Sequence, residues 1–121
     1  MLLPLVACAI TPSKQSLHQA DYGQQPGSSH RNEIRAAFAD LLIDPASARY
    51  EYGEPEPGWG EDQNGFVYGW VVWTRIDSNN QFGVFTGWQT YKVLTVNGDV
   101  HSIYRPLEPD MFGNPRFERL R

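Results

Sequence analysis

Residues 66–76 read Phe-Val-Tyr-Gly-Trp-Val-Val-Trp-Thr-Arg-Ile, and this stretch decides the fold. β-Branched and aromatic residues favour strands, in which successive side chains point to opposite faces. One face is expected to carry Phe66, Tyr68, Trp70, Val72 and Ile76, and the other to carry Val67, Val71 and Trp73. The stretch is therefore predicted to be the clearest strand of the chain.

Three further strands are expected, over residues 48–53, 82–96 and 100–104. Asn97-Gly98, between the last two, is the preferred pair for a two-residue type I′ hairpin. Residues 54–62 contain two prolines and two glycines and are interpreted as an acidic loop rather than regular structure. The arginine-rich end, residues 116–121, is interpreted as a solvated tail.

A helix is predicted over residues 31–43, because its apolar residues recur at the spacing of one helical face. These residues are Ile34, Ala37, Phe38, Leu41 and Leu42. Asp44-Pro45 is expected to end the helix, since proline disfavours a helical conformation in the residue before it. The order of elements predicts an α+β fold, with one N-terminal helix packed on an antiparallel meander sheet of about four strands.

Length and charge limit the possible functions. The chain has 121 residues and a net charge of -4, which fits one domain and argues against a nucleic-acid partner. The three histidines, His18, His30 and His101, lack the spacing of metal ligands, and no nucleophile stands in a recognisable catalytic motif. We therefore expect no catalytic residue, no bound metal and no cofactor, and we expect that the protein is not an enzyme.

The single cysteine lies close to the start of the sequence. Leu5-Val6-Ala7-Cys8 resembles the lipobox of bacterial lipoproteins, in which the Cys thiol is diacylglycerylated and the new amine is acylated. That resemblance implies a lipid on Cys8 and stable membrane anchoring by two chains. No Lys or Arg precedes Cys8 and Pro4 interrupts the apolar run, so residues 1–8 are interpreted as a truncated or remnant signal. The alternative is an incidental free cysteine.

The remaining chain divides into two parts. Residues 9–30 are rich in Ser, Gly, Gln and Pro without apolar periodicity, and are interpreted as a flexible tether. Residues 31–121 are interpreted as a single α+β domain.

Three segments resemble small, poorly characterised bacterial lipoproteins. They are residues 41–50, Leu-Leu-Ile-Asp-Pro-Ala-Ser-Ala-Arg-Tyr; residues 80–87, Asn-Gln-Phe-Gly-Val-Phe-Thr-Gly; and Tyr91-Lys92-Val93 followed by Asn97-Gly98. Val84 stands where the family pattern has a second glycine. The resemblance implies the fold and an envelope location, and it implies no activity.

Aromatic residues supply the candidate binding surface. The helix can cover only one face of the sheet, so Trp73, Phe85, Trp88 and Tyr91 are candidates for a patch on the other face. Trp and Tyr combine a large apolar area with a polar edge, which suits a binding surface. The alternative is that cross-strand aromatic pairs simply stabilise the sheet.

Two functions remain open. The first is an envelope-anchored lipoprotein acting as a non-enzymatic interaction or assembly module that holds another envelope protein. The second is a small cell-wall glycan-binding or glycan-processing domain, in which Trp73 or Trp88 stacks on sugar beside the carboxylates of residues 54–62. A concave pocket shared by aromatics and carboxylates would favour the second. Position 9, directly after the cysteine, is Ala rather than the Asp that retains many lipoproteins in the inner membrane. The resemblance therefore implies the outer membrane, facing the periplasm.

Overall fold

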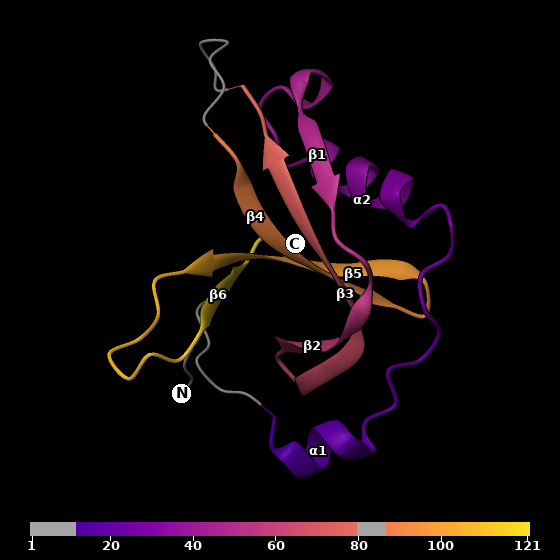
Figure 1. The fold of residues 1–121 in the computed structure, drawn as a ribbon, viewed down its shortest axis with the longest axis vertical. Helices are drawn as coiled ribbons and strands as arrows, with labels where there is room; N and C mark the ends of the chain where they lie inside the picture. The colour runs from indigo at the N-terminus through magenta and orange to yellow at the C-terminus, as the bar shows by residue number, and fades with distance from the viewer. Residues whose placement is uncertain (1–11, 80–86) are drawn as a thin grey trace.

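A computed structural model describes residues 12–79 and 87–121 (Figure 1). The helical elements are α1 (Lys14–Gln19), α2 (His30–Ala39) and a 3₁₀ turn, η1 (Pro45–Ser47). The strands are β1 (Arg49–Tyr52), β2 (Glu56–Asp62), β3 (Gly65–Asp77), β4 (Gln89–Val96), β5 (Asp99–Leu107) and β6 (Arg116–Arg119). The fold is α+β with an antiparallel sheet, as the sequence predicts.

The sheet runs in the order β1-β3-β4-β5-β6, and every pair is antiparallel. β1 pairs with the end of β3 that finishes at Asp77, and β2 pairs with the end that begins at Gly65. β1 and β2 therefore share one edge of β3. Between them, the Gly53 amide donates to the Trp73 carbonyl at 2.8 Å.

The prediction of about four strands was wrong, because the described residues form a sheet of six. β2 occupies most of the stretch interpreted as an acidic loop. Its proline is tolerated because an edge strand needs backbone hydrogen bonds on only one side. β6 forms within the arginine-rich end interpreted as a solvated tail, where Glu118 pairs with Arg105 of β5.

The helical content also differs from the prediction of one helix over residues 31–43. α2 ends at Ala39, before the predicted end, and η1 begins at the proline expected to stop it. α1 lies within the stretch interpreted as a tether, and the Ser13 hydroxyl caps it by accepting from the Ser16 amide at 3.0 Å.

Residues after α1 contact the sheet. The Tyr22 ring meets the Tyr68 ring edge-on at 5.9 Å between centroids. The Trp70 indole donates to the Gly23 carbonyl at 3.1 Å, and the Gln24 amide donates to Asn97 Oδ1 at 3.2 Å. Part of the predicted tether thus lies against the sheet.

Two apolar cores lie on opposite faces of the sheet. The core beneath α2 contains Ile34, Ala37, Phe38, Ala48, Val72, Ile76, Val93 and Ile103. The second contains Val71, Leu94 and Tyr104, with Val67, Trp73, Val96 and Phe117 packed against it. The alternation predicted along residues 66–76 is confirmed at these core positions. The Asn97-Gly98 hairpin is also confirmed, since both residues have the positive φ of a type I′ turn, 52° and 91°.

Candidate interaction surface

The predicted surface residues do not all lie on one face. Trp73 is half-buried in the core opposite α2. Tyr91 instead packs under α2, with its ring centroid 5.0 Å from that of Phe38. Trp88 contacts Arg75, which lies two residues beyond Trp73 in β3 and therefore on the same face. Phe85 and Cys8 lie outside the described residues.

Trp88 lies beside two cations. The guanidinium carbons of Arg75 and Arg49 lie 5.0 Å and 5.6 Å from its ring centroid. Trp88 remains 37% exposed, and the two arginine side chains are 49% and 57% exposed. Arg75 also contacts the Glu51 carboxylate, with 2.5 Å between Nη1 and Oε1. We call Trp88, Arg49, Arg75 and Glu51 together the Trp88 surface. It is a solvent-facing indole flanked by charged side chains.

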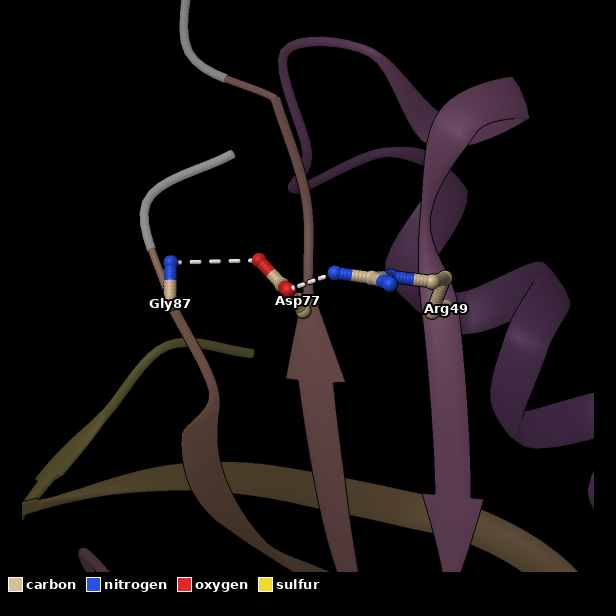
Figure 2. Close-up of polar contacts among 3 residues, drawn as sticks. All are labelled: Arg49, Asp77 and Gly87. Atoms are coloured by element: carbon tan, nitrogen blue, oxygen red, sulfur yellow. Dashed lines mark hydrogen bonds and ion pairs between the residues drawn. The ribbon is translucent and has the colours of Figure 1, made fainter. Parts of the chain in front are cut away.

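Asp77 connects the backbone segments that carry the Trp88 surface (Figure 2). Its carboxylate is buried, forms an ion pair with Arg49 and accepts a hydrogen bond from the Gly87 amide at 3.1 Å. The aspartate therefore joins β1, the end of β3 and the residue before Trp88. Sequence analysis missed this group, because Arg49 and Asp77 are 28 residues apart and no local pattern pairs them.

A lysine lies within the second core. Lys92 is 7% exposed, and its Nζ lies 4.8 Å, 5.1 Å and 5.6 Å from the ring centroids of Phe117, Trp59 and Tyr104. Burial lowers the pKa of Lys92 to about 8. The three aromatic rings favour a higher pKa for Lys92, because their electron-rich faces stabilise the ammonium form.

Tyr104 links this lysine cluster to β2. The Glu61 amide donates to its hydroxyl at 3.2 Å, and the Ser102 hydroxyl donates to it at 3.0 Å. On the same face, the Trp73 indole donates to Glu56 Oε1 at 3.1 Å. One carboxylate of the predicted acidic loop thus contacts one predicted surface aromatic.

A separate shallow pocket lies between α2 and the start of β5. It is lined by Glu33, Ala36, Ala37, Asp40, Asp99, Val100 and Arg121. None of the predicted aromatic residues and none of the carboxylates of residues 54–62 belongs to it. Its rim is mainly acidic.

Within residues 12–79 and 87–121, no three His, Cys, Asp or Glu side chains are grouped as a metal site would require. No helix of this described part has the length and apolar character needed to cross a membrane. Comparison with protein-family models, with curated proteins and with solved structures finds no match to this chain.

Proposed function

We propose that this protein is a non-enzymatic interaction module that holds another envelope protein through the Trp88 surface. The observation that carries the proposal is the exposed indole of Trp88 beside Arg49 and Arg75. Trp and Arg are, with Tyr, the residue types enriched among the residues that dominate binding energy at interfaces. Asp77 holds Arg49 and the backbone beside Trp88, which lowers the entropy lost on binding.

The proposal includes the cellular location. The lipobox-like Leu5-Val6-Ala7-Cys8 supports a lipid on Cys8, and the resemblance to small bacterial lipoproteins supports the outer membrane, facing the periplasm. Metabolic palmitate labelling with membrane fractionation tests this part. We expect label and membrane association in the native protein and neither in Cys8→Ser. Equal labelling of both, or of neither, would remove the anchor from the proposal.

Site-specific photocrosslinking in cells tests the interaction surface. Benzoylphenylalanine replaces Trp88 in one variant and the exposed Gln63, in the β2–β3 turn, in the control. We expect one protein adduct from position 88, none from position 63, and loss of the adduct when Arg75→Glu is added. Equal adducts from both positions, or an adduct indifferent to Arg75→Glu, would contradict the proposal.

The crosslinked protein then serves as the purified ligand. Trp88→Ala is expected to weaken its binding by about 30-fold, the loss typical of a dominant interface tryptophan. Circular dichroism should show an unchanged fold, because Trp88 is partly exposed and belongs to neither apolar core.

A second candidate function is cell-wall glycan binding. The contact between Trp73 and Glu56 supports it, because an indole face with an adjacent carboxylate suits the apolar face and hydroxyls of a sugar. Tryptophan fluorescence titration with soluble peptidoglycan fragments tests it. Saturable quenching that Trp73→Phe abolishes and Trp88→Phe preserves would favour this function over the first.

A further inference from the structure

The loop between β5 and β6 carries the two most exposed large apolar side chains among the described residues. Met111 is 89% exposed and Phe112 is 80% exposed, and they are adjacent in sequence. Figure 1 shows this loop, in gold, extending from the side of the sheet. An exposed apolar pair at a loop tip is costly in water unless a partner covers it.

Asp110 gives this loop a defined shape. Its Oδ1 accepts from the amides of Phe112 and Asn114, at 2.8 Å and 2.9 Å. Its own amide donates to the Asn114 carbonyl at 3.1 Å, and the Gly113 amide donates back to the Asp110 carbonyl at 2.9 Å. Gly113 has φ of 81°, which a residue with a β-carbon rarely adopts.

These contacts pre-form the tip. A loop that already holds its bound shape loses less conformational entropy when it docks. Loops of this kind, held by their own hydrogen bonds on a rigid scaffold, are frequent carriers of binding function. We call residues 108–115 the Met-Phe finger.

The charged residues beside the loop tip indicate which class of partner it can bind. Glu108 and Asp110 lie on the N-terminal side of the tip and Arg116 follows it, so residues 108–116 carry a net negative charge that would oppose an anionic lipid surface. The shallow pocket of a second copy would also repel the finger, because it is lined by three acidic residues, Glu33, Asp40 and Asp99, against one basic residue, Arg121. An apolar pocket with a basic rim on a different protein meets both requirements.

We propose that the Met-Phe finger inserts Phe112, with Met111 beside it, into an apolar, basic-rimmed pocket of another folded protein. The finger connects β5 and β6, whereas the Trp88 surface is formed by β1, β3 and the residue that precedes β4. The inference shares with the proposed function only the premise of a protein partner. Different substitutions test this inference and the proposed function.

Photocrosslinking at the tip tests the inference. Benzoylphenylalanine replaces Phe112, and the matched control carries it at Gln63, an exposed polar position in another β-turn. We expect an adduct with one protein, whose crosslinked residues map to an apolar pocket. Adding Met111→Glu or Glu108→Lys to the crosslinking protein should lower the yield at least fivefold. The Arg75→Glu change tests the Trp88 surface separately.

Other results would overturn the inference. They are an adduct with phospholipid or with a second copy, a yield no greater than at Gln63, or a protein adduct that both substitutions leave unchanged. Flotation with vesicles of phosphatidylethanolamine and phosphatidylglycerol provides a second measurement. Binding to these vesicles that Phe112→Asp abolishes would assign the finger to a membrane instead. Thermal unfolding should be the same for Phe112→Asp and the native chain, which excludes misfolding as the cause.

Discussion

Gly69 lies so close to the carbonyl oxygen of Thr95 that a β-carbon on Gly69 would overlap this oxygen. The approach occurs where β3 and β4 pair, next to the shift in register between Leu94 and Thr95 in the β4–β5 pair. A flexible side chain could move aside, but a backbone carbonyl of the central sheet cannot do so without breaking strand pairing.

Gly69→Ala is therefore expected to lower the free energy of unfolding by about 3 kcal/mol, at the upper end of overpacking effects. Urea unfolding followed by circular dichroism measures it. Gly27→Ala is the matched control, because nothing lies within 4 Å of a β-carbon there, and it should stay within about 0.5 kcal/mol. A similar small loss for Gly69→Ala would mean that β4 shifts freely.

Stability should depend on pH through Lys92. Its pKa is about 8 in the folded chain and near 10.5 when unfolded, so the unfolded chain binds more protons between these values. The free energy of unfolding should therefore rise between pH 8 and pH 9.5, by at most about 1.4 kcal/mol per pH unit. Burial raises the pKa of Tyr91, so unfolding should again become easier above pH 10.

Lys92→Met should remove that rise and increase stability at pH 7, since an apolar side chain then fills the space of a buried cation. Lys14→Met, at the exposed start of α1, is the control and should keep the rise. Urea unfolding at pH 7, 8 and 9 measures both. Destabilisation by Lys92→Met at pH 7 would show that the three aromatic rings outweigh the cost of burial.

Two neighbouring ion pairs between β1 and β3 should differ in energy. Asp77→Ala is expected to cost about 1–2 kcal/mol, because it removes a buried carboxylate together with its ion pair to Arg49 and its hydrogen bond from the Gly87 amide. Glu51→Ala breaks the solvent-exposed pair with Arg75 and should cost less than about 1 kcal/mol. Thermal unfolding compares the two variants, and equal losses would contradict the importance of burial.

The Met-Phe finger should respond to acid. Hydrogen bonds from Asn114 and Phe112 hold the pKa of Asp110 below its ordinary value. The order they impose is present at neutral pH and should be lost as the pH falls through that lowered pKa. Amide NMR signals of Phe112 and Asn114 should shift together in that range. In Asp110→Asn the same signals should not respond to pH.

Local patterns predicted the parts of the fold that depend on neighbouring residues. Residues 66–76, the helix containing Ile34 and Phe38, and the Asn97-Gly98 turn all follow from periodicity or from a φ preference. β2 was missed because its prolines and glycines read as a loop, whereas pairing with β3 supplies the hydrogen bonds that its composition disfavours. The formation of β2 therefore depends on its partner strand β3 and not on its own composition.

The candidate surface shows the same limit. Counting by twos from Trp88 into β4 separates Trp88 and Lys92 from Tyr91, so the sequence did contain the signal that Tyr91 faces α2. The contacts of Trp88 with Arg49 and Arg75 required the register of two other strands. No local pattern carries that information.

The contrast between the short hairpins of the sheet and the long-range contact of Gln24 with Asn97 has a consequence for folding kinetics. The β2–β3 and β4–β5 hairpins close through short turns, so most of the sheet assembles from contacts that are near in sequence and therefore fast to form. Gln24 and Asn97 meet across 73 residues, which makes docking of the N-terminal segment a late and slower step. Hydrogen exchange should then find the amides of β3 and β4 the last to open, and a species with a formed sheet and an undocked N-terminal segment should precede the native state.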